Sequence, residues 1–398
     1  MSTKVYYPQP LTEKQILDSF NKSSENEIKW LISNVLLTEL PSLRDELKNC
    51  VDKISESNDF EVRLPLTSHN SEILKGIITR ENFKITGLNI TVKNIKILNN
   101  GKSFKLQLKQ GKEIIIKQLI DCHDSINNAI NMIDKITATY ENTEEANAII
   151  SPNITLSYIS KLLNNIESAL KSLKSPFPSY IFPDYRLPAT YFEPELPANI
   201  SLDILISNSE LGIDFKSLSP VVNRPWSIIV DKTNRRSFAD IVRDTISKER
   251  NKTIPRILID EYNNLLEWQK QLKERHEDPS NLTAVTSSSA SLLSSSSSSS
   301  SPSPHAPESS GIASMFSSIF GSNNEPSAST LLKTASKYLE ESITYVDNNN
   351  DPVVVLVSQT CDVISSDPVL LTISIKLDSL KKTCEKIQEN FEAVLSSS

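Results

Sequence analysis

Gly101, Lys102 and Ser103 are the residue types that end a phosphate-binding loop. Such a loop also has an earlier glycine, and it continues into a helix whose N-terminus faces the phosphate. Here Lys96 occupies the position of the earlier glycine, and the residues after Ser103 alternate like a strand. The stretch therefore predicts a turn between two strands and no nucleotide site.

Cys122 and His123 are neighbours that could act as metal ligands or as a thiol nucleophile with its base. Adjacent side chains on a helix point about 100° apart, and Cys122 belongs to the apolar side of a predicted helix. We therefore expect a core cysteine beside a histidine at the edge of the core. The other histidines, His69, His276 and His305, are scattered, so no histidine cluster is predicted.

Carboxylates are candidates for acid and base catalysis. Asp121 and Asp124 flank the apolar side of one predicted helix, and Glu25 and Glu27 lie near the start of another. We interpret all four as solvated helix residues. With 4 histidines and 7 glycines in 398 residues, we predict a protein that is not an enzyme and that uses no cofactor or metal.

Three further carboxylates, Asp203, Glu210 and Asp214, lie on or between two predicted strands, 200–207 and 211–218. Because apolar and polar residues alternate along both strands, Asp203 and Asp214 are expected to face outward, away from the apolar side. Two interpretations stay open. These residues are either the polar side of a half-exposed sheet or an acidic strip that faces a partner protein.

Composition and charge restrict the class of protein. A net charge of -7 without a long run of Lys or Arg argues against nucleic-acid binding. No apolar run reaches the roughly 18 residues of a membrane-spanning helix, and the first residues lack the apolar core of a signal peptide. The four cysteines have neither disulfide nor metal spacing. These features predict a cytosolic protein that is not inserted into a membrane.

Four segments repeat apolar residues at alternating intervals of three and four, which is typical of helices that pack side by side. Pro41 is expected to kink the first helix or to start a second helical piece. Ser151 and Asp367 each precede a proline, as at helix starts, although "VLLTISI" after the second could also form a strand. The predicted apolar seams are Leu36, Leu40, Leu43, Leu47, Cys50 and Ile54; Ile115, Leu119, Cys122, Ile126, Ala129, Ile133, Ile136 and Tyr140; Leu156, Ile159, Leu163, Ile166, Leu170 and Leu173; and Leu370, Ile373, Leu377, Leu380, Cys384, Ile387, Phe391 and Val394.

Other segments alternate with the period of a strand. "FEVRLPL", "GIITRENFKITGLNITVKNIKIL" and "SFKLQLKQ" predict three to five antiparallel strands, with a hairpin turn at Asn100-Gly101. A second hairpin is predicted at 200–218, with its turn at Asn208-Ser209. A third strand pair is predicted at 342–346 and 353–360.

The region 231–330 is predicted to be an insertion. Two helices are expected near Ser237–Arg250 and Ile254–His276. After them comes a run of eight serines, Ser294–Ser301, in a composition that cannot bury enough apolar area to fold. Within this tract "GIASMFSSIFG" is either a short docking helix or a chance apolar cluster.

The predicted fold is therefore α+β, with a discontinuous antiparallel four-helix bundle joined to an antiparallel β domain and a partly disordered insertion. Helices with this spacing must bury their seams against each other. The predicted parts are 1–23, a flexible N-terminal arm; 24–57, 112–175 and 367–396, the bundle; 58–111, 198–230 and 340–362, the β domain; 176–197, a Pro-rich crossing; 231–276, a helical insertion; and 277–330, a Ser-rich disordered linker.

The crossing and the hairpin after it read "FPDYRLPATYFEPELPANISLDILISNSELGIDFKSL". This stretch resembles the segment characteristic of the Rogdi leucine-zipper family, most closely its fungal branch. "ENEIKWLISNVLLTELPSLRDEL" is similar to the opening helix of that family, and "FEVRLPL", "ENFKITG" and "KGIIT" are similar to its first strands. The resemblance covers about 25–218 and the last helix, and the insertion 231–330 has no counterpart in the animal members.

The fungal branch is the small subunit of the RAVE complex, the regulator of the vacuolar and endosomal proton ATPase. The resemblance implies a helical bundle joined to a β domain and a non-catalytic scaffold that promotes reassembly of the peripheral sector of the ATPase onto its membrane sector. It implies a large propeller-containing RAVE subunit as partner, with ATPase peripheral-sector subunits and, through the large subunit, a ubiquitin-ligase adaptor. It also implies a cytoplasmic protein recruited to vacuolar and early endosomal membranes.

If the chain is such a scaffold, a strip in the crossing is the predicted contact or domain junction, consisting of Phe192, Glu193, Pro194, Leu196 and Pro197, with Asp203, Glu210 and Asp214 nearby. In the alternative, Phe192 and Leu196 only fill the groove between bundle and sheet. A second function also stays open, a coiled-coil tether or trafficking adaptor acting as a homo-oligomer. Bundles and coiled coils share the same heptads, so the sequence does not separate the two.

Overall fold

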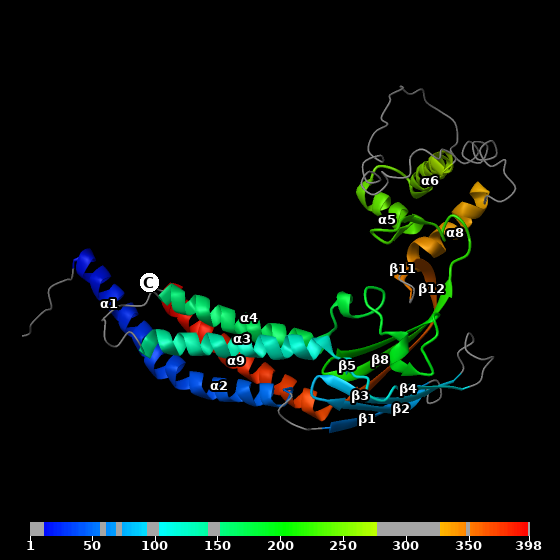
Figure 1. Ribbon diagram of the computed structural model, residues 1–398. Coiled ribbons are helices and arrows are strands. Elements are labelled where there is room, and N and C mark those ends of the chain that lie inside the picture. Colours follow the sequence, from blue (N-terminus) through cyan, green and yellow to red (C-terminus); the bar gives the residue numbers. More distant parts are fainter. Residues whose placement is uncertain are drawn as a thin grey trace, which may run out of the picture. The chain divides into compact units, whose positions relative to one another are not determined.

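The computed structural model describes residues 12–55, 61–68, 74–93, 103–141, 152–276, 327–347 and 351–396. The chain divides into two compact units, of which unit 1 contains Met1–Lys216 and Thr360–Ser398 and unit 2 contains Ser217–Gln359. Helices and antiparallel sheets are both present (Figure 1), which confirms the predicted α+β class. The predicted division into a bundle and a β domain stays a prediction.

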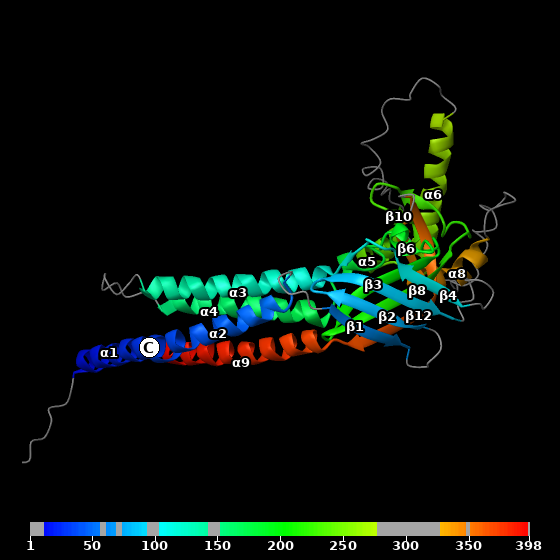
Figure 2. The ribbon, with the colours of Figure 1, turned by 60° about the horizontal axis from the view of Figure 1, so that its bottom comes forward.

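In the helical part of unit 1, α3 packs against α2 and α4, and α9 packs against α4, α2 and α1. Figures 1 and 2 both show these helices side by side. Their bounds are Glu13–Leu31 for α1, Leu37–Asp52 for α2, Lys117–Glu141 for α3, Pro152–Lys174 for α4 and Pro368–Ser396 for α9.

The predicted seams lie in the core of unit 1. Every seam residue of the first segment is buried, and so is every one on α9 except the half-buried Val394. On α3 the seam is buried from Leu119 to Ile136. Ile115 is wrong as a seam residue, because it precedes the helix, lies in the short strand β5 (Ile114–Ile115) and is exposed.

The seam of α4 differs from its prediction. Leu156, Leu163 and Leu170 are only half-buried, whereas Leu162 and Ala169 are fully buried. The physical reason is that α4 packs against both α3 and α9. A helix between two neighbours needs an apolar face wider than one seam.

The first predicted helix differs at its start and in its middle. α1 begins inside the predicted flexible arm because Thr12 and Gln15 form a capping box, in which the Thr12 N–H donates to Gln15 Oε1 at 3.0 Å. A π-helical segment, Ile32–Leu36, separates α1 from α2. Pro41 lies inside α2, so the predicted interruption occurs upstream of the proline.

The first sheet of unit 1 is antiparallel, with the order β1-β2-β3-β4-β6, and β5 pairs with β3. One face of this sheet belongs to the core. On the other face the strand register aligns an exposed row of Pro65, Ile77, Asn89, Gln107 and Glu193. The strand bounds are Glu61–Thr67 for β1, Leu74–Glu81 for β2, Lys84–Val92 for β3, Phe104–Leu108 for β4 and Phe192–Glu193 for β6.

The second sheet has the order β11-β12-β8-β7. Asn208 and Ser209, which have positive φ angles of 50° and 65°, form the turn between β7 and β8, as predicted. The predicted pair at 342–346 is confirmed, because Ser342 pairs with Leu356 and the register continues antiparallel. The turn predicted at Asn100-Gly101 lies outside the described residues. The bounds are Ile200–Ser207 for β7, Glu210–Pro220 for β8, Ser342–Val346 for β11 and Pro352–Ser366 for β12.

A buried ion pair joins the first sheet to α9. Arg80 Nε of β2 lies 2.7 Å from Asp367 Oδ2, and both side chains are at most 2% exposed. The other oxygen of Asp367 accepts the N–H groups of Val369 at 2.9 Å and Leu370 at 3.2 Å. Asp367 therefore caps α9, which explains why "VLLTISI" is helical and not a strand.

Unit 2 has its own core around Trp226, Phe238 and Tyr338, whose rings are in contact. The two helices predicted in this region are confirmed as α5 and α6. The bounds are Phe238–Lys248 for α5, Ile254–His276 for α6, Ala328–Glu341 for α8, Ile229–Asp231 for β9 and Arg236–Ser237 for β10.

Helix α8 was not predicted, and its first residues overlap the predicted disordered linker. Ser327 caps it by accepting the Thr330 N–H at 3.3 Å. Its buried residues Leu331, Ala335 and Tyr338 have helical spacing, a signal that the adjoining serine-rich composition hid. The rest of the linker, 277–326, lies outside the described residues, together with the serine run and "GIASMFSSIFG".

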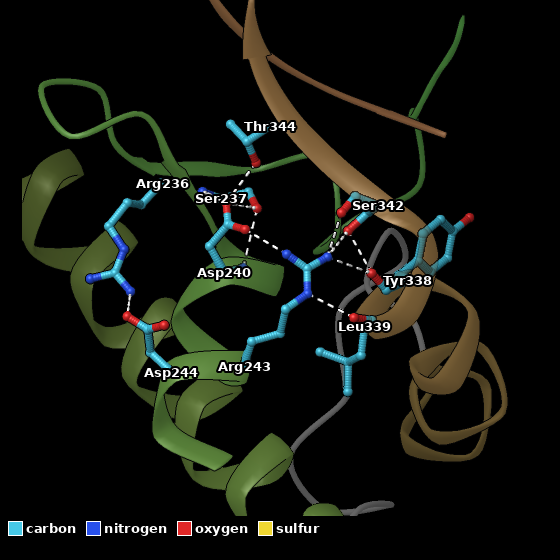
Figure 3. Close-up of polar contacts among 9 residues, drawn as sticks. All are labelled: Arg236, Ser237, Asp240, Arg243, Asp244, Tyr338, Leu339, Ser342 and Thr344. Atoms are coloured by element: carbon cyan, nitrogen blue, oxygen red, sulfur yellow. Dashed lines mark hydrogen bonds and ion pairs between the residues drawn. The ribbon is translucent and has the colours of Figure 1, made fainter. Parts of the chain in front are cut away.

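Arg243 of α5 closes the C-terminal end of α8 (Figure 3). Its guanidinium donates to the carbonyl oxygens of Leu339 at 2.7 Å and Tyr338 at 3.1 Å, and to Ser342. It also pairs with Asp240 at 2.6 Å. The last carbonyls of a helix have no partner within the helix, so Arg243 satisfies α8 from a neighbouring element.

Candidate partner-binding region

The Pro-rich crossing contacts the start of β7 through Arg186, which donates to Ile200 O, and through the Phe182 N–H, which donates to Asp203. Two short 3-10 turns, Pro178–Tyr180 and Ala189–Tyr191, divide it. Arg186 holds it in place by donating to the carbonyl oxygens of Pro197 at 3.0 Å and Ala198 at 3.1 Å, and to Ile200. The crossing is thus tied to its own downstream end.

Gln118 of α3 caps the other end of the β7 edge. Its Nε2 donates to Ile206 O at 2.9 Å, and its Oε1 accepts the Ile206 N–H at 2.8 Å. The same Nε2 donates to Ser172 O of α4 at 2.8 Å. The amide therefore takes the place of a further strand on an otherwise open sheet edge. The sequence analysis missed Gln118, since a polar residue beside a seam has no special signal.

The predicted strip separates into buried and exposed residues. Phe192 is 1% exposed and Leu196 2% exposed, and both belong to the core of unit 1. Glu193 and Pro194 are exposed, and Pro197 is half-buried. Because β6 is a strand, its successive side chains point to opposite faces, so only Glu193 and Pro194 are open to a partner.

The predicted outward orientation of Asp203 is wrong, because the residue is buried and only 2% exposed. The crossing covers it, and the Phe182 N–H donates to Asp203 Oδ1 at 3.2 Å. Lys216 Nζ lies 3.1 Å from Asp203 and also pairs with Asp214, which is half-buried. The outward assignment failed because it considered the two strands without the segment that packs over them.

Burial dominates the electrostatics of this cluster. It raises the pKa of Asp203 from its ordinary value of 3.8, although the charge of Lys216 and the Phe182 N–H oppose that shift. Burial also disfavours the charge of Lys216, but the hydrogen bond to Asp214 and the charge of Asp203 outweigh it and raise the pKa of Lys216. The three residues therefore form a structural ion cluster, in which Asp203 is buried and Lys216 and Asp214 are partly open to solvent.

Glu210, the third predicted carboxylate, is half-buried and accepts a hydrogen bond from Ser366 of β12. The adjacent turn donates hydrogen bonds to the last carbonyl groups of α4. The Asn208 N–H donates to Lys174 O at 2.9 Å, and the Ser209 N–H donates to Leu173 O at 2.7 Å. The hairpin turn thus closes the C-terminal end of α4. Glu210 thus has a different partner from Asp203 and Asp214, which share Lys216, and the acidic strip stays a prediction.

The crossing encloses little space for a ligand. A cavity of about 20 Å³ lies beneath it, bordered by Gln118, Tyr185 and Asp203. A volume of that size holds roughly one water molecule. Lys117 Nζ lies over the ring of Tyr185, 4.4 Å from its centre, at the border of the cavity.

Cys122 is buried, and burial raises the pKa of its thiol, so it is a core residue as predicted. His123 contacts Asp124 at 3.2 Å on the surface of α3.

Within the described ranges, no group of three His, Cys, Asp or Glu residues could hold a metal ion. Lys102 lies outside those ranges. Among the helices described, none is long and apolar enough to cross a membrane.

Comparison with known proteins decides the family. The profile described as "Rogdi leucine zipper containing protein" matches residues 27–392. The chain belongs to the Rogdi leucine zipper family. The chain is also similar to the "Regulator of V-ATPase in vacuolar membrane protein 2" of Saccharomyces cerevisiae, with 23% identity over 386 residues, which cover 94% of this chain and 93% of the yeast protein. The resemblance stated from the sequence is thereby confirmed.

Proposed function

We propose that this Rogdi-family protein is a non-catalytic scaffold subunit of a RAVE-like complex, which promotes reassembly of the peripheral sector of the vacuolar proton ATPase onto its membrane sector. The similar yeast protein is named as a regulator of that ATPase, and the similarity extends over nearly the whole of both chains. The structural observation that supports a scaffold is the exposed row of side chains across the first sheet, which ends at Glu193.

The proposed partners follow from the family resemblance. They are a large propeller-containing subunit, subunits of the peripheral sector of the ATPase and, through the large subunit, a ubiquitin-ligase adaptor. The protein would act from the cytoplasm at vacuolar and early endosomal membranes, without inserting into them. Within the predicted strip, Glu193 and Pro194 are the proposed contact residues, because Phe192 and Leu196 are occupied in the core.

We also propose that α2, α3, α4 and α9 form the discontinuous antiparallel four-helix bundle that supports this surface. The contacts of α3 with α2 and α4, and of α9 with α4 and α2, favour that arrangement. Since the seam residues are buried within one chain, the tether that would need them between chains has less support.

The test is affinity capture of the full-length tagged chain from the cytosol of its own cell type, with quantitative mass spectrometry. We expect the wild-type chain to recover a large propeller-containing subunit and ATPase peripheral subunits. Glu193→Lys should lower that recovery at least about fivefold, since reversing a contact charge weakens association. Glu389→Lys, a matched reversal at an exposed residue of α9, should leave it unchanged.

Two results would contradict the proposal in different ways. Recovery of vesicle-tethering proteins without any ATPase subunit would refute the assembly role. Equal recovery by wild type, Glu193→Lys and Glu389→Lys would refute the contact at Glu193 and leave the assembly role standing.

A further inference from the structure

A polar groove runs between α3 and α4, away from the crossing. It has an open volume of about 340 Å³ and is lined by two lysines, four asparagines and one methionine. The lining residues are Asn128, Asn131, Met132 and Lys135 of α3 and Lys161, Asn164 and Asn165 of α4. Figures 1 and 2 show the two helices side by side along their length.

The two helices are antiparallel, which places the lysines at a similar level. Tyr140 of α3 hydrogen-bonds Thr155 of α4 near one end, and Gln118 of α3 hydrogen-bonds Ser172 of α4 near the other. Between these points Lys135 approaches the level of Lys161. Two cations on opposite sides of one groove repel each other, and an anion bound between them would offset this repulsion by attracting both.

No carboxylate of either helix neutralises these lysines. Asp134 of α3 pairs with Arg44 of α2 at 2.7 Å, and Glu167 of α4 pairs with Lys381 of α9 at 2.9 Å. Within the described residues, Lys135 and Lys161 have no ion pair. Lys161 Nζ lies over the Tyr158 ring, 5.8 Å from its centre, a weak cation–π contact that leaves the ammonium without a carboxylate partner among the described residues.

The asparagines add hydrogen-bonding capacity that the chain itself does not use. None of the four side-chain amides hydrogen-bonds another residue in the part of the chain that the structure describes. Each amide offers two N–H donors and one oxygen acceptor. Met132, half-buried at the centre, provides a flexible apolar contact. The groove is thus positively charged and polar, with one apolar point.

We propose that this groove binds an acidic amphipathic helix of a partner protein, with its carboxylates on Lys135 and Lys161 and an apolar side chain on Met132. A third helix fits the groove between two packed helices, and Asn128 to Lys135 spans about two turns, or roughly 10 Å. The chain carries a net charge of -7. The attraction of an acidic helix nevertheless depends on the charges that line the groove, because salt screens charges more than about 8 Å away. This surface is separate from the Glu193 row.

The test uses the full-length chain and a fluorescent alanine-based peptide of roughly 20 residues, long enough to be helical. The peptide carries two glutamates four residues apart beside a central leucine, and a matched peptide has glutamine in place of both glutamates. Fluorescence anisotropy at low and physiological salt measures the affinity. We expect the glutamate peptide to bind more tightly than the glutamine peptide, with the difference shrinking as salt rises.

Variants locate the binding. Lys135→Glu/Lys161→Glu should weaken the glutamate peptide at least about tenfold, because two attractions become repulsions. Lys75→Glu/Lys105→Glu makes the same charge change at two exposed lysines of the first sheet and should change affinity less than about twofold. Equal affinity for both peptides, or equal loss in both double variants, would overturn the proposal.

A final variant tests whether the chain fills its own groove. Glu144 and Glu145 lie in the α3–α4 connection, outside the described residues. If the glutamate peptide binds only after Glu144→Gln/Glu145→Gln, the occupant is this segment and the partner-helix proposal is wrong. Binding to the unaltered chain supports the partner.

Discussion

Side-chain orientation within one short strand separates residues that hold the fold from residues that can meet a partner. Phe192 and Glu193 are adjacent in β6, yet the first is a core residue and the second is exposed. A core phenylalanine and a surface glutamate respond differently to mutation. The predicted contact strip therefore contains core residues, whose mutation lowers stability, and exposed residues, whose mutation can weaken partner binding without lowering stability.

Phe192→Ala should lower the free energy of unfolding by about 3–5 kcal/mol, because it removes a buried ring and leaves a cavity. Urea denaturation of the full chain measures the change. Glu193→Ala is the neighbouring control and should leave the midpoint close to that of wild type. An unaltered midpoint in Phe192→Ala, combined with lost partner capture, would instead assign Phe192 to the contact.

Asp203 should make stability depend on pH. Because its pKa is raised in the folded state above the ordinary value of 3.8, folding favours the protonated acid, and this contribution is present at low pH and lost as pH rises through the folded pKa. Relative to Asp203→Asn, wild type should gain stability as pH falls from 7 toward about 4. Chemical denaturation across this range measures the difference, and Asp214→Asn is the half-buried comparison. A difference independent of pH would contradict the shift.

At the scale of elements, several helix and strand ends are satisfied by side chains from elsewhere. Gln118 closes the β7 edge, Arg243 closes α8, and Asp367 both caps α9 and pairs with Arg80 of β2. Buried backbone groups need hydrogen-bond partners, and these side chains supply partners that the elements do not provide themselves.

Arg80→Met should be strongly destabilising, by about 3–5 kcal/mol, because it leaves the carboxylate of Asp367 buried without its cation. Arg80→Met/Asp367→Asn should recover part of the loss, since asparagine caps a helix without a charge. Arg63→Met, at the exposed pair of Arg63 with Glu61, is the matched control and should change little. Equal losses at Arg80 and Arg63 would contradict this role, and thermal unfolding measures all three.

At the scale of the molecule, the heptads are used within one chain. Apart from the exposed Ile115, the predicted seam residues lie in the core of unit 1 or pack against it, which leaves little of them for a second copy. The chain alone should therefore elute as a monomer of 44.5 kDa in size-exclusion chromatography with light scattering. A mass twice as large, independent of dilution, would favour the homo-oligomeric tether.

The sequence by itself determined the class of most long elements and the family, whereas helix α8 and the first part of α1 were not predicted. Regular spacing, as on α3 from Leu119 to Ile136, identifies a helix because burial of one face repeats with the helical period. Alternation with the period of a strand predicted β1 to β4, β7, β8, β11 and β12, but not the short strands β5, β6, β9 and β10. These are local patterns, so they can be read without knowing what packs against them.

Only the tertiary structure decided which polar residues are buried and what they do. Asp203 alternates like an outward residue, but the crossing packs over it. Gln118 and Arg80 have ordinary sequence surroundings, yet their partners Ile206 and Asp367 lie far along the chain. The lysines of the α3–α4 groove likewise came together only through helix packing. Burial and pairing depend on residues distant in sequence, and no local period records them.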